Sequence, residues 1–426
     1  MFIGDLHIHS KYARACSKDI TLQRLADNAK LKGLSFLGTG DFQHPKHYPD
    51  ILNSLQEDSN GILWTKETNP FPFIWQTEIS LMYKQDGKGR RIHHTILSPN
   101  KGVTAQIIES LGKRGRMDYD GRPIFGFSSI ELVEMMRSIS EDIEIIPAHC
   151  LTPYFGIFGS MSGFDSFEDC FKEKSKYVNA VETGLSAAPP MLWRVSKFDK
   201  LNLISSSDPH SYHSYRLGRE ATLFDFKQIT YQNIIKAIRT GEGLSGTIEV
   251  DPNYGKYHFD GHRVCGVSFS PEESKKHNNI CPVCRQKLTI GVQNRIEQLA
   301  DRPEGFVKNN AKKFYSLLPL AELISVILKK GVSTKTVLQE YNKLISKFNT
   351  ELNVLMDVSL EDLKLVVNEK IAETVIKIRE GKVRYKPGFD GNYGRVILDD
   401  KDENNLIKED HNFLKSIQKG LDSFSH

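Results

Sequence analysis

The sequence predicts an α/β fold followed by a small metal-binding segment and a helical C-terminal part, and three observations lead to this prediction. Over residues 1–245, short apolar runs alternate with helical patterns, which favours a parallel sheet, open or closed into a barrel. Residues 254–292 are rich in Cys, His, Gly and Lys. Residues 293–426 are expected to be mainly helical, because apolar side chains between 309 and 381 recur at spacings of three and four.

The expected elements follow the chain in order. Phe2 and Ile3 open a strand that leads into Asp5. Thr21 has the side chain of an N-cap for the next helix, and Gly33 ends that helix. Further strands are expected at residues 34–37, 73–75, 92–97, 143–146, 177–181 and 201–204. Gly, Pro and Asn then mark a linker between 243 and 255, and the charged tail from residue 399 onward is expected to fray.

Composition and charge exclude several classes of protein. The 426 residues carry 57 Lys and Arg against 53 Asp and Glu, a net charge of +4, so any nucleic-acid contact must come from local basic patches. A hydrophobic content of 39% excludes wholesale disorder. No apolar run approaches the ~18 residues of a membrane helix, and the first residues lack the layout of a signal peptide. We therefore expect a cytoplasmic protein without membrane contact, whose six cysteines are too few for a disulfide scaffold.

Histidines and acidic residues gather at or near the ends of the predicted strands. His7 and His9 are two residues apart, so a strand would project both imidazoles to one side, where they could share a metal. Seven other positions, on six further runs, follow the same rule: Asp41, Glu78, His93 or His94, His149, Glu182, Asp208 and His210. Any one of them alone is more simply a surface or core residue. Agreement among six strand ends argues against chance, because this rim carries the active site in parallel α/β folds.

The donor types indicate the chemistry. Mixed imidazole and carboxylate donors suit Zn²⁺ or Mn²⁺, and their number exceeds the needs of one ion, so we expect a cluster of two or three divalent ions (Zn²⁺, Mn²⁺ or Mg²⁺). Such a cluster lowers the pKa of a bound water and neutralises phosphate charge during displacement. Because no Ser or Cys nucleophile motif accompanies it, phosphoester hydrolysis is favoured over acyl transfer.

Four motifs over residues 1–240 resemble the polymerase-and-histidinol-phosphatase (PHP) metallohydrolase superfamily: Asp5-Leu6-His7-Ile8-His9-Ser10, Gly38-Thr39-Gly40-Asp41, Pro147-Ala148-His149 and Ser207-Asp208-Pro209-His210. The resemblance implies a distorted β/α barrel carrying up to three metals. It implies as ligands His7, His9, Asp41, Glu78, His93, His149, Asp208 and His210, with His149, Asp208 and His210 as catalytic residues. His93 is chosen over His94 because Thr95-Ile96-Leu97 matches the family strand. Asp41, where the family usually has His, and Ala15-Cys16, where many members with three ions have another His, leave the number of ions open.

A second cluster predicts a structural zinc site. His262 and Cys265 precede a Cys281-Pro282-Val283-Cys284 knuckle across a gap typical of zinc-binding segments. Three thiolates need a fourth ligand, for which His262 has matching spacing and His258 is the alternative. A cytosolic redox pair is the competing interpretation, but the surrounding Lys and Arg residues are more typical of a nucleic-acid finger. Cys16, Cys150 and Cys170 are expected to be small buried residues.

The combination of both clusters resembles the endonuclease Q family of DNA-repair enzymes over most of the chain. The segments that carry this resemblance include Gly255-Lys256-Tyr257-His258, the Cys-Pro-x-Cys finger, Glu182-Thr183-Gly184-Leu185-Ser186 and Leu217-Gly218-Arg219-Glu220. It implies metal-dependent hydrolysis of the phosphodiester on the 5′ side of a deaminated base (uracil, hypoxanthine or xanthine) or an abasic site in damaged DNA. The products would carry 3′-hydroxyl and 5′-phosphate ends. The family finger commonly has Gly after its last Cys, where this chain has Arg285.

Lesion recognition requires flipping of the nucleotide and a pocket that accepts a carbonyl where the normal base has an amine. Four large apolar side chains in polar or Gly/Pro-rich segments are candidates to fill the gap in the base stack, although ordinary packing is the simpler explanation for each: Met191, Trp193, Tyr154 and Phe155. Candidate phosphate contacts are Arg194, Arg216, Arg219, Lys256 and Arg263.

Two alternatives to a nuclease are a small-molecule PHP phosphatase and a non-catalytic module that binds DNA or associates with a polymerase. A phosphatase has no use for a finger and a helical part, and a non-catalytic module should have lost more ligands than the two departing positions. The sequence does not identify replication or repair proteins as partners.

Overall fold

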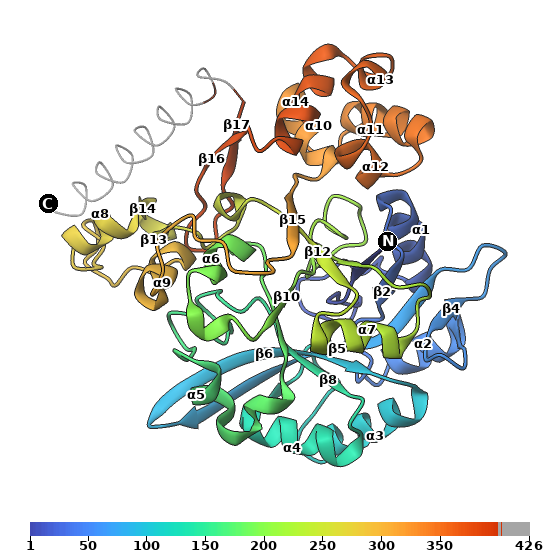
Figure 1. Cartoon of the computed structure of the whole chain (residues 1–426), viewed down its shortest axis with the longest axis vertical. Coiled ribbons are helices and arrows are strands. Elements are labelled where there is room, and N and C mark those ends of the chain that lie inside the picture. The colour runs from blue at the N-terminus through green and yellow to red at the C-terminus, as the bar shows by residue number, and fades with distance from the viewer. Residues whose placement is uncertain (399–401, 403–426) are drawn as a thin grey trace, which may run out of the picture.

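The computed structural model describes residues 1–398 and 402. An α/β body occupies the lower part of Figure 1, with the cysteine-rich segment at one side and a group of helices above the body. Two clusters of buried apolar side chains form the core, and the larger one extends from the body into the helices above it. The tail that we expected to fray, and with it the end of the predicted part 293–426, lies outside the described residues.

One large sheet carries the body, in the order β15-β12-β11-β1-β2-β5-β4-β3, with β6 paired to β5 and β8, and β7 paired to β5. Its strands are β1 (Phe2–Asp5), β2 (Phe36–Gly38), β3 (Leu55–Glu57), β4 (Leu63–Thr65), β5 (Pro72–Gln85), β6 (Lys88–Ser98), β7 (Ile124–Phe125), β8 (Glu144–Pro147), β11 (Ala221–Phe224), β12 (Leu244–Glu249) and β15 (Lys313–Ser316).

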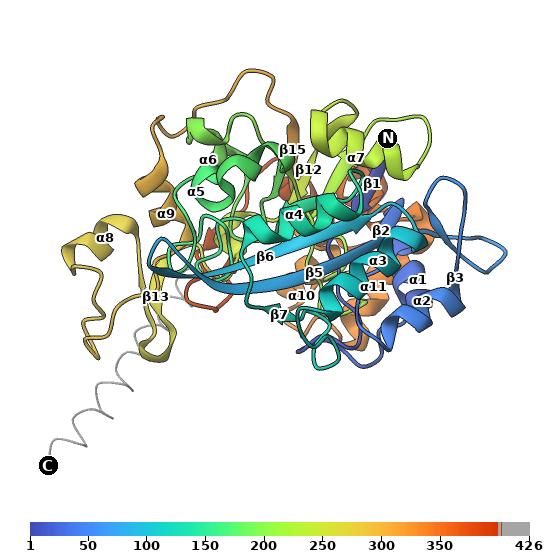
Figure 2. The ribbon, with the colours of Figure 1, turned by 90° about the horizontal axis from the view of Figure 1, so that it is seen from below.

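The expectation of a parallel sheet is only partly correct. Strands β1, β2 and β5 are parallel, but β5 pairs antiparallel with β6, β6 with β8, and β1 with β11. The cause is visible at Asp86 and Gly87, which adopt positive φ angles of 52° and 75°. Two such residues form the tight turn that suits a hairpin, so β5 returns directly as β6 without a crossover helix. Figure 2 shows this long hairpin running across the body.

The strands curve into the distorted barrel that the sequence predicts. A separate parallel pair, β9 (Ala180–Glu182) and β10 (Asn202–Ile204), fills the space between the two ends of the sheet. Strand β9 lies beside β8, and β10 lies beside β12. The carboxyl ends of β1, β8, β9 and β10 therefore face the same interior.

Helices pack around this barrel: α1 (Leu22–Lys32), α2 (His47–Ser54), α3 (Lys101–Gly112), α4 (Ser129–Ile139), α5 (Phe167–Phe171), α6 (Pro189–Trp193) and α7 (Tyr231–Thr240), with the 3₁₀ turns η1 (Lys172–Tyr177) and η2 (Ser196–Phe198). Helix α1 has the predicted ends. The Thr21 side chain accepts a hydrogen bond from the Arg24 N–H, and Gly33 has a φ of 98°, where a side chain would be strained.

The remainder of the chain follows β12. The cysteine-rich segment contains η3 (Pro252–Tyr254), β13 (Asp260–His262), η4 (Arg263–Cys265), β14 (Val267–Phe269), α8 (Pro271–Lys276) and then α9 (Val292–Leu299). The helical group is α10 (Leu320–Leu328), α11 (Lys335–Phe348), α12 (Glu351–Met356), α13 (Leu360–Lys364) and α14 (Glu369–Arg379), and a hairpin of β16 (Arg384–Lys386) and β17 (Arg395–Ile397) follows. Because β15 pairs with β12, part of the predicted C-terminal region belongs to the main sheet. Within the described residues, no helix is both long and apolar enough to cross a membrane.

Candidate metal centres and substrate cleft

The barrel brings most of the predicted ligands into three adjoining groups. The groups are His7, His9 and Glu78; His9, Asp208 and His210; and Glu78, His93 and His149. The ligand atoms of each group lie within 4.8 Å of one another. His9 and Glu78 each belong to two groups, so the three are continuous. This arrangement has the form of a site for two or three neighbouring cations.

Local backbone geometry explains how these side chains converge. His7 and His9 follow β1, and His149 follows β8. Glu78 and His93 face each other across the β5–β6 hairpin, with Glu78 Oε1 2.8 Å from His93 Nδ1. The neighbouring His94 points away and bonds to the Ser129 hydroxyl at 2.9 Å, as strand alternation requires.

The buried polar atoms of the cluster fit divalent cations. His7 Nε2, His9 Nε2, Glu78 Oε1 and Asp208 Oδ1 are buried, and each lacks a hydrogen-bond partner of acceptable geometry among the described residues. His9 Nε2 lies only 3.1 Å from Asp208 Oδ1 and 3.2 Å from Glu78 Oε2. Buried polar atoms are normally hydrogen-bonded, and a convergence of unpaired nitrogen and oxygen atoms is what coordination of an ion would satisfy.

The opposite nitrogens of these imidazoles are held by other side chains. His7 Nδ1 lies 2.9 Å from Glu182 Oε2, and His9 Nδ1 lies 2.9 Å from Asp41 Oδ1. The Ser10 N–H and hydroxyl both donate to the second Asp41 oxygen at 2.7 Å. Such carboxylate–histidine pairs fix the orientation of metal-binding imidazoles.

Asp41 lies next to the three ligand groups but belongs to none of them. We predicted a metal ligand, but the carboxylate lies behind His9. Both of its oxygens are already engaged by His9 and Ser10. The substitution of His by Asp at this position thus leaves the three groups intact.

Three positions in and beside the cluster have an unusual backbone conformation. Asp41, His149 and Asp208 have φ angles of 41°, 31° and 42°, a region that non-glycine residues seldom occupy. Such outliers persist where the surrounding structure enforces them, and they cluster at functional sites.

The electrostatics of the cluster couple histidines to carboxylates. Burial alone would lower the pKa of His7, but Glu182, Glu78 and Asp208 together outweigh it and raise that pKa well above its usual value. The pKa of His9 is raised in the same way, against the effect of burial, by Asp41, Asp208 and Glu78. Without cations, these imidazoles carry protons that balance the carboxylates.

Cation affinity is therefore expected to rise with pH, because binding must displace protons from His7 and His9. A raised pKa means that the imidazolium–carboxylate pairs stabilise the cation-free fold at low pH and lose this effect as pH rises through the raised values. The stabilisation that Mn²⁺ adds to the melting temperature should grow over the same window. Titration calorimetry in buffers of different ionisation enthalpy should detect proton release, and a pH-independent affinity without release would contradict this account.

Sequence reasoning missed Arg122. Its Nη1 donates to Glu78 Oε2 at 3.0 Å, which places a fixed positive charge against the residue that two ligand groups share. Arg122 lies on the loop between α3 and β7, where no periodicity or motif indicates its direction. Glu182, in contrast, was visible at a strand end, and its role behind His7 is now explained.

A cleft of about 670 Å³ opens beside the ligands. His93, His149, Asp208 and His210 are part of its lining. The lining also contains small and polar residues and a basic and aromatic set, which we call the basic wall: Tyr154, Phe155, Arg216, Arg219, Lys256, Tyr257 and Tyr393. The predicted DNA contacts Tyr154, Phe155, Arg216, Arg219 and Lys256 thus lie in this wall. Arg219 is almost buried and donates to the Ser207 carbonyl and the Tyr393 hydroxyl.

The structure does not bring the other predicted DNA contacts to this cleft. Trp193 is 7% exposed and packs on Phe314 at 5.9 Å between ring centroids, and Met191 packs against the core. The two terminal nitrogens of Arg194 donate to Glu297, at 2.6 and 3.0 Å. Arg263 lines a separate groove beside the cysteine-rich segment. Met191, Trp193 and Arg194 come from a polar stretch of the sequence, but in the folded chain each of them packs against or bonds to another part of the body.

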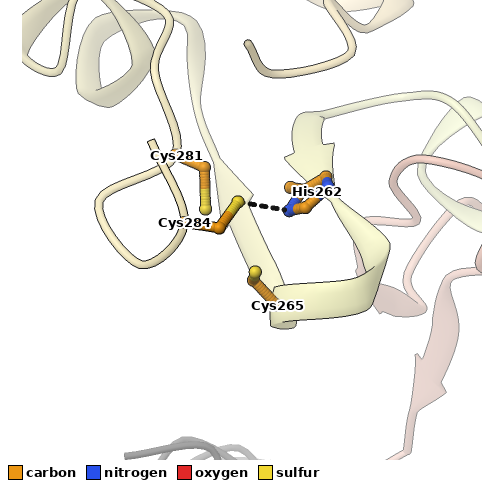
Figure 3. Close-up of side chains that lie close together, drawn as sticks. All are labelled: His262, Cys265, Cys281 and Cys284. Carbon is orange, nitrogen blue, oxygen red and sulfur yellow. Dashed lines mark hydrogen bonds between the residues drawn. The ribbon is translucent and has the colours of Figure 1, made fainter. Parts of the chain in front are cut away.

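The second cluster is compact (Figure 3). The ligand atoms of His262, Cys265, Cys281 and Cys284 lie within 4.8 Å of one another, and Cys284 Sγ is 3.4 Å from His262 Nδ1. Three thiols and one imidazole in this proximity fit a tetrahedral zinc site. The alternative ligand His258 is buried elsewhere, stacked on Phe259.

Arg285, which follows the last cysteine, has a φ of 64°. Only glycine adopts that angle without cost, which explains the residue that is common at this position of the finger. As expected, Cys16, Cys150 and Cys170 are buried and lie outside this cluster.

The chain is similar to proteins of known structure along almost its whole length. It is 31% identical to a lesion-specific endonuclease, PfuEndoQ from Pyrococcus furiosus, covering 94% of this chain and 96% of that one with a TM-score of 0.82. It is also 31% identical to an endonuclease Q in complex with a 27-mer duplex that has an abasic lesion at the active site. That match covers 94% of this chain and 97% of the other, with a TM-score of 0.84.

Sequence relatives agree with this result. Residues 319–382 match the family model described as the MJ0043 C-terminal domain. An uncharacterized Methanocaldococcus jannaschii protein, MJ0043, is 35% identical over 58% of this chain, and this chain spans only 31% of that protein's length.

Fold and site together define a hydrolase of the PHP type, built as a distorted β/α barrel with a cysteine–histidine segment and a helical region. The predicted resemblance is confirmed over nearly the whole chain: the protein belongs to the endonuclease Q family.

Proposed function

We propose that the protein is a metal-dependent DNA-repair endonuclease that cleaves the phosphodiester 5′ of deaminated bases and abasic sites. The observation that carries the proposal is the likeness, over 94% of the chain, to an endonuclease Q that holds an abasic duplex at its active site. The cleft supports it, because candidate metal ligands and basic and aromatic side chains line the same cavity. Lys and Arg side chains bind the phosphates of nucleic acids, and aromatic side chains stack on the bases.

In this proposal, the ligands are His7, His9, Glu78, His93, His149, Asp208 and His210, with Asp41 and Glu182 as orienting partners. Divalent ions bound there would activate a water and offset the charge of the scissile phosphate. The chain supplies the rest. Glu182 and Asp41 hold His7 and His9 in one orientation, and Arg122 offsets the carboxylate of Glu78.

The basic wall would hold the DNA. Arg216, Arg219 and Lys256 would contact phosphates, and Tyr154 and Tyr257 would stack on nucleotides. Tyr154 was one of the sequence candidates for the base stack, whereas Met191 and Trp193 do not line the cleft. A flipped uracil or hypoxanthine presents a carbonyl, whereas cytosine or adenine presents an amine. Fixed backbone N–H donors would accept the former and leave the latter unpaired, at a cost of ~1–3 kcal/mol.

The cysteine–histidine segment would bind structural Zn²⁺, since an unoccupied thiol cluster has no comparable reason to converge. We further propose that the chain divides near residues 245–254 and 292, as the sequence indicates. No membrane contact is proposed, and a cytoplasmic location follows the expectation from sequence.

One assay separates the proposed function from its alternatives. Labelled duplexes with a single uracil, hypoxanthine or abasic site, an undamaged duplex and p-nitrophenyl phosphate are incubated with the protein and Mg²⁺, Mn²⁺ or Zn²⁺. Incision only 5′ of the lesion, leaving 3′-hydroxyl and 5′-phosphate ends, is the expected result. Phosphate release alone would favour a small-molecule phosphatase, and binding without turnover would favour a non-catalytic module.

A further inference from the structure

A carboxylate from the helical region reaches the wall of the cleft. Glu322 lies in the first turn of α10 and is only 6% exposed. Its Oε1 accepts a hydrogen bond from Arg216 Nη1 at 2.6 Å, and its Oε2 accepts one from Tyr254 Oη at 2.7 Å. Arg216 lines the cleft beside the candidate ligands. One side chain thus connects the helices above the body to the site below them.

Arg216 lies on the segment that leaves the ligands Asp208 and His210. Its guanidinium is stacked over two rings, 5.6 Å from the centroid of Tyr215 and 5.5 Å from that of Tyr393. The side chain keeps 29% of its surface exposed. A free arginine side chain samples many rotamers, so a buried carboxylate on one side and ring faces on another fix the direction of the remaining N–H groups.

The same segment is tied to the helical region at a second point. Lys32 of α1 is buried and donates to the Ser214 carbonyl at 3.0 Å and to Glu351 Oε1 at 2.7 Å. Glu351 in α12 also accepts the Leu320 N–H at 2.9 Å, at the start of α10. The helix that carries Glu322 and the segment that carries Arg216 are therefore held in one buried network.

If Glu322 only held the helical region to the body, its partner would be enclosed between the two and would not reach the cleft. Lys32, Glu351 and Ser214 are enclosed between the elements that they join, and none of the three lines the cleft. The Glu322–Arg216 pair ends at the cleft itself. Its loss would change what the substrate meets, whereas the loss of an interface contact would mainly change stability.

We propose that Glu322 is a positioning residue for DNA cleavage, which acts through Arg216 and makes the helical region a component of the active site. This inference rests on the proposed function. Glu322 holds the Arg216 guanidinium toward the backbone phosphate beside the flipped nucleotide, and Tyr254 fixes the second oxygen of Glu322. The helical region needs no ligand of its own for this role.

The test compares Glu322→Gln, Arg216→Gln and the double variant with wild type on a duplex that wild type cuts. Glutamine keeps the size of Glu322 and an acceptor for Tyr254 but loses the charge. The single-turnover rate of Glu322→Gln should fall about tenfold, the loss expected when a substrate-contacting group is misplaced. The dissociation constant for the duplex and the melting temperature should stay close to those of wild type. Glu369→Gln, at an exposed ion pair of the same helical region, should cut at the wild-type rate.

The double variant should be no slower than Arg216→Gln, because Glu322 acts through that residue. A wild-type rate in Glu322→Gln, or losses that multiply in the double variant, would overturn the proposal. If Glu322→Gln does not fold, Arg216→Lys tests the contact from the other side: it keeps the charge without the planar fork, and a wild-type rate would again overturn the proposal. Absence of cleavage by wild type on every lesion duplex would instead refute the proposed function.

Discussion

Replacement of Asp208 by Asn is expected to reduce lesion cleavage on the order of a thousandfold, the scale on which loss of a fixed charge at a reacting phosphate or carbonyl acts. Asp208 Oδ1 is buried without an acceptable hydrogen bond and lies 3.1 Å from His9 Nε2. Desolvation would raise the pKa of Asp208, but His7, His9 and His210 lower it well below its usual value, so the carboxylate is charged at any working pH. Asparagine keeps the shape of this side chain and removes the charge that a cation needs.

Duplex binding should survive this change, because the basic side chains that line the cleft, Arg216, Arg219 and Lys256, are left unchanged. Cleavage is followed at saturating enzyme, and affinity is measured separately without divalent ions. Asp225→Asn, at an exposed position directly after β11, is the matched control and should cut normally. Cleavage by Asp208→Asn at a wild-type rate would remove Asp208 from the site.

Replacement of Cys281 by Ser should unfold the cysteine-rich segment and remove one zinc per chain. The apolar core of this segment consists of four buried side chains, Cys265, Val267, Cys281 and Leu288, which is too little to hold it without metal. Zinc binding contributes an apparent ~10–16 kcal/mol in small finger peptides. Amide protection over residues 258–292 should therefore collapse, and affinity for duplex DNA should fall because Lys256 and Tyr257 belong to the same segment.

Hydrogen exchange and elemental analysis measure both effects on the same sample. The control is Cys170→Ala, which changes a cysteine that is buried in the body outside the cluster. It should keep its zinc and its protection in the segment. Full zinc content in Cys281→Ser would show that the four side chains do not form one site.

The sequence predicted those features that depend on local order. His7 and His9 share a side because strand alternation is fixed by the backbone, and alternation also separates His93 from His94. The proximity of His262 to the three cysteines followed from spacing alone. The antiparallel β5–β6 pair was also readable, since Asp86-Gly87 is a common two-residue hairpin turn, but the alternation of strands and helices elsewhere favoured a parallel sheet.

Features that depend on tertiary approach could not be predicted. Asp41 follows a strand as a ligand would, yet its carboxylate lies 2.9 Å from His9 Nδ1 and outside the three ligand groups. Arg122 comes from a loop whose direction no pattern encodes. Trp193 and Arg194 lie in a stretch whose polar composition is typical of a surface. In the folded chain Trp193 packs on Phe314 and Arg194 bonds to Glu297, each more than a hundred residues away in sequence. Long-range pairing of this kind is set by packing and not by spacing.

The most direct measurement is the anomalous scattering of a crystal soaked in Mn²⁺, with zinc located at its own absorption edge. The account predicts Mn²⁺ peaks within coordination distance of His7, His9 and Glu78, of His9, Asp208 and His210, or of Glu78, His93 and His149, together with zinc among the three cysteines and His262. Metal found only in the cysteine cluster, with the barrel histidines bare, would contradict it.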